Sequence, residues 1–214
     1  MTRKKDKPLV INYIVIFVEG DAEELIFDKL IKYYQNTKTI KCLKIKIDNT
    51  QGFPSENKMS GNLWKIIQNE KAKNKGKNIV VDFKALFCEY DTDVFEKQTQ
   101  KVPNWNIIEK NLKNVYNIKK FCHVKAKTSI EDWMLDDVSG LLNALGLPEN
   151  TNITGVDGQD KIKNIFKKRN IYYSRKKGFD KIKPYIEKLD IEKIRNARAT
   201  ELKELEKVLE INNI

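Results

Sequence analysis

The most constraining feature of this chain is an apolar run that ends in an acid and leads directly into a helical pattern. Residues 14–18 are all apolar, Glu19 follows them, and apolar positions at helical spacing occupy residues 23–34. A second apolar run, residues 85–88, ends in the acidic stretch 89–93. Strands followed at once by helices are typical of open α/β sheets, which place ligands beyond the carboxyl ends of their strands.

The acids at the two strand ends are candidate ligands for a metal ion. If the strands are neighbours, Glu19, Asp91 and Asp93 converge. We expect Gly20 to permit a sharp turn after Glu19, and Glu89 to point opposite Asp91. Three carboxylates with no nearby His or Cys suit Mg²⁺ or Mn²⁺, and Mg²⁺ commonly combines one or two carboxylates with phosphate oxygens. The alternatives are a helix-capping role for Glu19 and a turn-forming role for Asp91 and Asp93.

Strand-like and helix-like segments alternate along the first two thirds of the chain. The expected strands are residues 13–18, 43–47, 85–88 and 120–124, and the expected helices are residues 23–34, 63–73 and 105–116. Residues 79–81 are either a short extra strand or a connector, and residues 51–61 are the clearest loop. This alternation predicts an α/β fold with a mainly parallel sheet flanked by helices.

From residue 133 onward the pattern is helical. The expected helices are residues 133–145, 160–168, 180–189 and 191–209. We expect an α/β domain over residues 1–145 and a basic helical extension over residues 146–214, packed on that domain. The apolar seam of the last helix fits packing on its own domain or on a second subunit, so a homo-oligomer stays open.

The charge of the chain indicates its partners. Lys and Arg number 41 against 30 Asp and Glu, giving a net charge of +11. Such an excess attracts phosphates of any sequence, although a Lys-rich chain can also reflect genome base composition. No apolar stretch approaches the length of a membrane span, and the apolar amino-terminal run lacks a signal-peptide cleavage site. We therefore expect a cytoplasmic protein with a nucleic-acid partner and no membrane contact.

The densest basic stretch lies in residues 161–183. The predicted nucleic-acid-binding residues are Lys125, Lys127, Tyr172, Tyr173, Arg175, Lys176 and Lys177. Basic side chains can follow a phosphodiester chain while tyrosines stack on its bases. The alternative is a solvated basic helix and loop.

Cysteine and histidine point away from zinc and from triad chemistry. Cys42, Cys88 and Cys122 are dispersed without the spacing of a zinc site, so we expect buried free thiols. His123 is the single histidine and lies in a strand-like segment, where packing is the expected role. One histidine excludes multi-histidine metal sites and argues against Ser-His or Cys-His catalysis.

The two acidic strand ends resemble the Toprim domain of topoisomerases, bacterial primases, OLD-family nucleases and ribonuclease M5. In that family one strand ends in Glu-Gly, here Glu19-Gly20, and a later strand ends in D-x-D, here Asp91-Thr92-Asp93. Residues 17–27, F-V-E-G-D-A-E-E-L-I-F, look most like the OLD-type and anti-phage Toprim nucleases. Residues 129–135, S-I-E-D-W-M-L, are similar to a stretch of small Toprim defence proteins such as RloB and the PARIS effector. The resemblance spans roughly residues 10–145.

The resemblance implies a metal-dependent endonuclease that cleaves tRNA, other RNA or DNA in anti-phage defence. Asp91 and Asp93 would bind Mg²⁺ or Mn²⁺, Glu19 would bind metal or act as general base, and Glu131 would join the metal site unless it only supports a helix start. A separate ATPase partner is compatible with this role, since the chain contains no Walker-type motif. The alternatives are an RNA maturation enzyme similar to ribonuclease M5 and a non-catalytic scaffold similar to RecR.

Overall fold

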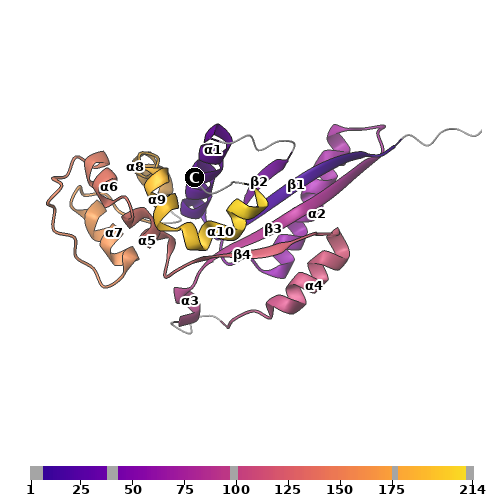
Figure 1. Ribbon diagram of the computed structural model, residues 1–214. Helices are drawn as coiled ribbons and strands as arrows, with labels where there is room; N and C mark the ends of the chain where they lie inside the picture. The colour runs from indigo at the N-terminus through magenta and orange to yellow at the C-terminus, as the bar shows by residue number, and fades with distance from the viewer. Residues whose placement is uncertain (1–6, 38–42, 97–100, 175–177, 211–214) are drawn as a thin grey trace, which may run out of the picture.

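A four-stranded, all-parallel sheet forms the centre of the protein (Figure 1). The computed structural model describes residues 7–37, 43–96, 101–174 and 178–210. The strands are β1 (Leu9–Val18), β2 (Lys44–Asn49), β3 (Ile79–Asp91) and β4 (Phe121–Ala126), in the order β2-β1-β3-β4. Parallel neighbours require crossover connections, which helices supply here. The predicted α/β class and parallel sheet are confirmed.

Both faces of the sheet are covered, which explains why its central strands are continuously apolar. Along β1, Ile14, Ile16 and Val18 face one core, whereas Val15 and Phe17 face the other. The first core is completed by α1 (Asp21–Thr37) and the carboxyl-terminal helices, and the second by α2 (Glu56–Lys73) and α4 (Trp105–Tyr116). The carboxyl ends of all four strands meet at one edge of the sheet.

The part of the chain that follows β4 is a group of short helices packed against α1 and β4. These helices are α5 (Ile130–Leu135), α6 (Val138–Ala144), α7 (Gly158–Lys167), α8 (Phe179–Ile186), α9 (Ile191–Ala197) and α10 (Ala199–Val208). The short α3 (Asp93–Glu96) lies earlier in the chain, directly after β3. Apolar residues of all six helices from α5 to α10 belong to the same core as the α1 face of the sheet. No helix in the described part of the chain has the length and apolar character needed to cross a membrane.

Three of the expected boundaries were wrong. The helix expected over residues 133–145 is two helices, because the Asp137 side chain caps α6 by accepting a hydrogen bond from Gly140 N. The helix expected over residues 191–209 breaks at Arg198, whose φ of −106° and ψ of 22° are not helical. The loop expected over residues 51–61 is shorter, since α2 begins at Glu56.

Two other open points have answers in the structure. Residues 79–81 are the first residues of β3 and not a separate element. Cys88 and Cys122 are free and buried, as expected, and burial raises the pKa of both thiols. Cys42 lies outside the described residues.

Candidate active site at the carboxyl edge of the sheet

A small cavity lies where β1 and β3 end. Its volume is about 180 Å³, and its lining is Glu19, Asp91, Asp93, Thr128, Ser129, Asp157 and Gln159. β1 and β3 are paired in parallel, with Phe17 beside Cys88, so their ends reach the same edge of the sheet. The structure therefore brings Glu19, Asp91 and Asp93 to one cavity, as the parallel-strand argument expects.

Glu19 is half-buried and is held by the loop that follows β2. Gly52 N donates a hydrogen bond to the Glu19 carbonyl oxygen at 2.5 Å, and Thr50 N donates to the Val18 carbonyl oxygen at 2.9 Å. The chain bends at Glu19 and Gly20 before α1 begins, as expected, and Gly20 does so without a left-handed backbone. What restricts the position is space, because a Cβ on Gly20 would lie 3.1 Å from a carboxylate oxygen of Glu23.

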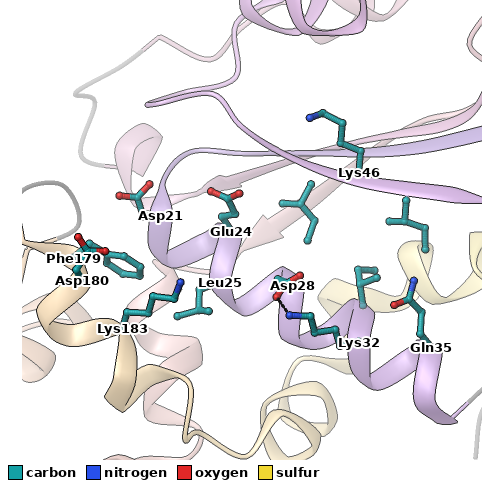
Figure 2. Close-up of a pocket in the computed structure, with 13 residues that line it drawn as sticks. Asp21, Glu24, Leu25, Asp28, Lys32, Gln35, Lys46, Phe179, Asp180 and Lys183 are labelled. Atoms are coloured by element: carbon teal, nitrogen blue, oxygen red, sulfur yellow. Dashed lines mark hydrogen bonds and ion pairs between the residues drawn. The ribbon is translucent and has the colours of Figure 1, made fainter. Parts of the chain in front are cut away.

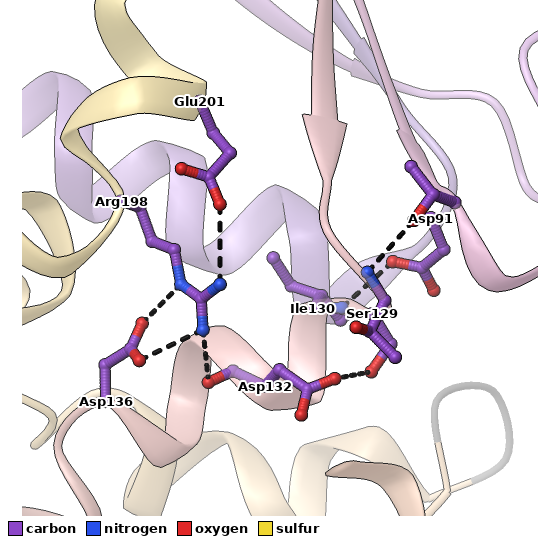
Figure 3. A network of polar contacts seen from close by, with 9 residues as sticks. Asp91, Ser129, Ile130, Asp132, Asp136, Arg198 and Glu201 are labelled. Atoms are coloured by element: carbon purple, nitrogen blue, oxygen red, sulfur yellow. Dashed lines mark hydrogen bonds and ion pairs between the residues drawn. The ribbon is translucent and has the colours of Figure 1, made fainter. Parts of the chain in front are cut away.

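Asp91 is the last residue of β3 and is only 3% exposed. Its Oδ1 accepts a hydrogen bond from Ile130 N at 2.9 Å, at the first turn of α5 (Figure 3). The Asp91 side chain is therefore packed against backbone and does not face open solvent. The connection from β4 to α5 folds back over the end of β3 and buries the carboxylate.

The backbone of the D-x-D segment is tied to the same connection. Thr92 N donates to the Ala126 carbonyl oxygen at 3.1 Å, and Asp93 N donates to the Thr128 carbonyl oxygen at 3.2 Å. In return, Thr128 N donates to Thr92 Oγ1 at 3.0 Å. Thr128 has a φ of 69°, a left-handed conformation that costs a β-branched residue of the order of 1–3 kcal/mol. These hydrogen bonds hold the strained residue in place at the cavity.

Glu89 lies on the same face of β3 as Asp91, contrary to our expectation. Residues two apart on an extended strand share a face, and β3 stays paired with β4 through Glu89–Val124 and Asp91–Ala126. Glu89 is fully buried. Burial, followed by the charges of Glu89 and Glu19, raises the pKa of the Cys88 thiol.

Glu131 is buried in the interior and is not part of the cavity lining. Its Oε1 accepts a hydrogen bond from the Tyr173 hydroxyl at 2.9 Å. Tyr173 is 4% exposed and packs against Phe166, with 5.5 Å between ring centroids. Tyr173 is therefore unavailable for base stacking, and our grouping of it with the surface residues was wrong.

The other predicted nucleic-acid contacts are exposed where the structure describes them. Lys125 and Lys127 are exposed at the end of β4, and Lys127 directly precedes the cavity residue Thr128. Tyr172 is 83% exposed. The remaining three predicted contacts, Arg175, Lys176 and Lys177, lie outside the described residues.

The sequence did not point us to the residues that α7 contributes. Asp157 caps α7 by accepting a hydrogen bond from Asp160 N at 2.9 Å, and Gln159 lies in the first turn. Gly158 permits α5 and α7 to approach closely, since a Cβ there would lie 2.5 Å from Asp132 Oδ1. An Asp-Gly pair before an apolar helical pattern is a usual helix start. It gives no sign that this helix reaches the sheet edge.

The donor chemistry of the cavity fits a hard divalent cation. Glu19, Asp91, Asp93 and Asp157 offer carboxylate oxygens, and none of the described thiols or imidazoles lines the cavity. Within the described residues, no three acidic, thiol or imidazole side chains are already arranged to hold a metal ion. Mg²⁺ keeps several waters and needs only one or two carboxylates from a protein. A preformed shell of protein ligands is therefore not required.

A larger cavity of about 690 Å³ lies between α1, β2 and α8 (Figure 2), and three of its four acidic residues make polar contacts nearby. Asp28 pairs with Lys32 at 2.5 Å. Asp21 and Glu24 both accept hydrogen bonds from the Asn49 amide, at 2.8 and 3.1 Å. These contacts satisfy three of the acidic groups locally, whereas the acids of the small cavity meet at the ends of adjacent strands, so the small cavity is the better candidate for chemistry.

Comparisons of this chain with models of known protein families, with curated proteins and with solved structures found no match. The functional argument consequently depends on the residues and their geometry.

Proposed function

We propose that this protein is a Mg²⁺- or Mn²⁺-dependent nuclease that hydrolyses phosphodiester bonds of RNA or DNA. The observation that carries the proposal is the meeting of Glu19, Asp91 and Asp93 on one cavity at the carboxyl ends of adjacent parallel strands. Two of these acids arise from one D-x-D segment and the third from the neighbouring strand. This is the arrangement that the resemblance to Toprim nucleases leads us to expect.

The residues of the cavity divide the proposed tasks among them. Asp91 and Asp93 hold the cation, and Glu19 either binds it or accepts a proton from the attacking water. The cation, when bound, neutralises charge on the phosphate and makes that water more acidic. The Thr128 hydroxyl and the Gln159 amide, which line the same cavity, can donate hydrogen bonds to phosphate oxygens.

The charge of the chain supports a nucleic-acid substrate. The net charge is +11, and Lys125 and Lys127 are exposed close to the cavity. Ammonium groups there would attract phosphates without reading sequence. The motifs of this chain resemble those of small Toprim defence proteins. That resemblance favours a role as an anti-phage effector that cleaves tRNA, other RNA or DNA, with a separate ATPase as its partner.

A non-catalytic nucleic-acid scaffold is the second candidate, and the burial of Asp91 favours it. A carboxylate that is 3% exposed and bonded to Ile130 N can serve to cap α5 alone. In that case Asp91 would be a structural residue only, and the basic surface would bind nucleic acid without cutting it.

Measurements of cleavage and of metal binding on matched variants distinguish the nuclease from the scaffold. Glu19→Gln and Asp93→Asn should abolish Mn²⁺-dependent cleavage of tRNA or plasmid substrates and the rise in melting temperature that Mn²⁺ causes in the wild type. Asp180→Asn removes the same charge from an exposed acid of the larger cavity and should change neither. Binding without cleavage under any divalent metal, and with no Mn²⁺ stabilisation, would establish the scaffold instead.

A further inference from the structure

Helix α5 connects the candidate site with the carboxyl-terminal helices. Its first residue, Ile130, donates its N–H to Asp91 Oδ1 at 2.9 Å. Within the same helix, the Asp132 carbonyl oxygen accepts a hydrogen bond from Arg198 Nη2 at 3.0 Å, at the junction of α9 and α10 (Figure 3). A helix of six residues thus links Asp91 of the site to Arg198, which lies 107 positions away in the sequence.

Arg198 holds α5 at several points. Its Nε and Nη2 pair with the two carboxylate oxygens of Asp136 at 2.6 and 3.0 Å, directly after α5. Its guanidinium carbon lies 5.9 Å from the centre of the Trp133 ring, inside α5. The planar guanidinium makes these contacts together, which a lysine ammonium cannot do. The contacts fix both the position and the rotation of a helix too short to be stable by itself.

Asp132 extends the same network to the other wall of the cavity. Ser129 Oγ, which belongs to the cavity lining, donates to Asp132 Oδ2 at 3.1 Å. The Asp132 carboxylate also lies against Gly158 at the start of α7, between the lining residues Asp157 and Gln159. The orientation of α5 therefore sets the positions of cavity residues on two segments as well as the hydrogen bond to Asp91.

We propose that Arg198 is a positioning residue for the site: it holds α5 so that Ile130 N–H keeps the Asp91 carboxylate oriented in the cavity. Arg198 does not touch the cavity and acts through α5. Its effect on metal binding rests on the proposed function, whereas its effect on the Asp91–Ile130 hydrogen bond does not. Loss of a group that orients a metal ligand typically weakens metal binding about 10- to 100-fold.

The chain offers a closely matched control in Arg195. This arginine also makes a two-point ion pair, from Nε and Nη2 to the carboxylate of Glu206 at 2.7 and 3.2 Å. It also lies over an aromatic ring, that of Tyr34, at 6.0 Å. The side chains of Arg195 and Arg198 are 12% and 15% exposed. Replacing either one removes the same kind of interaction, but only Arg198 contacts α5.

The test compares Arg198→Ala, Arg198→Lys and Arg195→Ala with the wild type in two measurements. Amide hydrogen exchange, followed by NMR, reports protection of Ile130 N–H, and calorimetry reports the Kd for Mn²⁺. We expect faster Ile130 exchange and a Kd raised about 10-fold or more in Arg198→Ala, with smaller changes of the same sign in Arg198→Lys. Arg195→Ala should lose comparable thermal stability and keep both values near those of the wild type.

The outcomes for the two proposals are separate. Unchanged Ile130 exchange in both Arg198 variants, or equal acceleration in Arg195→Ala, would overturn the positioning role whatever the metal data show. If Arg198→Ala does not fold, the Ile130 exchange of Arg198→Lys decides the positioning role. That variant retains the positive charge but loses the planar guanidinium that contacts several groups at once. A wild type that binds no Mn²⁺ overturns the metal-dependent function, and Ile130 exchange still decides the role of Arg198.

Discussion

The Tyr173 hydroxyl donates a hydrogen bond to Glu131 at 2.9 Å inside the protein, although the two residues are 42 positions apart in the sequence. Both residues are buried, and the contact joins α5 to the segment that follows α7. It lies one residue from Ile130, which holds Asp91. The buried tyrosine is therefore unavailable for the base-stacking role that the sequence suggested for it, and it instead contacts the helix that begins at Ile130.

Substitutions of the two adjacent tyrosines should affect different properties of the protein, one its stability and the other its nucleic-acid binding. Tyr173→Phe removes a hydrogen bond to a buried carboxylate and should lower the free energy of unfolding by about 1–3 kcal/mol. It should leave nucleic-acid affinity unchanged. Tyr172→Ala removes an 83% exposed ring and should weaken binding of single-stranded substrate with little loss of stability. Urea unfolding and fluorescence anisotropy measure the two quantities, and a binding defect confined to Tyr173→Phe would contradict this assignment.

Asp91 should show separable structural and chemical roles. Asp91→Asn keeps an oxygen that can accept the hydrogen bond from Ile130 N, so its free energy of unfolding should stay close to that of the wild type. Asp91→Ala leaves that buried N–H without its acceptor and should cost about 1–3 kcal/mol. Both variants should lose Mn²⁺-dependent cleavage. Cleavage that survives in Asp91→Asn would show that the carboxylate has only the structural role.

The sequence was sufficient to predict which acids lie at the carboxyl edge of the sheet, but not which segments pack over that edge. Glu19, Asp91 and Asp93 could be placed together because strand ends are local features and parallel strands end on the same side. The burial of Asp91 depends on the return of residues 126–130 across β3, which is a tertiary contact. Gln159 reaches the same cavity through the packing of α7 on α5. Neither contact leaves a pattern in the sequence.

The helix boundaries failed for a related reason. Apolar spacing continues through Asp137 and through Arg198, so periodicity alone predicts one helix in each region. The breaks occur because the side chains bind elsewhere: Asp137 accepts hydrogen bonds from Gly140 N and Asp190 N, and Arg198 reaches α5. Tyr172 and Tyr173 lie in a segment without regular structure, where no period indicates which ring faces inward.

His123 should give the protein a specific dependence of stability on pH. Burial, and secondly the charge of Lys125, lowers the pKa of its imidazole below the usual value near 6.5. The unfolded chain therefore binds a proton at a higher pH than the folded protein, and this group's contribution to stability is lost as pH falls below about 6.5. The contribution is fully present above that pH. His123→Leu should flatten the pH dependence of the unfolding free energy between about pH 6.5 and the lowered pKa, and an unchanged slope would contradict this.

The exposed lysines at the end of β4 should contribute to nucleic-acid binding in a way that depends on salt and not on metal. Lys125 and Lys127 are exposed at the carboxyl end of β4, on the sheet edge where the cavity lies, so replacing both with Ala should weaken binding to all sequences. The slope of log affinity against log salt concentration should fall by roughly 1 for each phosphate that is no longer neutralised. Chelation of divalent cations should stop cleavage while this binding persists.

Lys71 and Lys73 provide the matched control for that prediction. Both are exposed at the end of α2, which leads into the first residues of β3 and so lies toward the amino edge of the sheet, opposite the cavity. Their replacement with Ala lowers the net charge by the same amount and should change the salt slope little. If both double variants reduce the slope equally, net charge alone explains the binding, and the substrate has no preferred path beside the cavity.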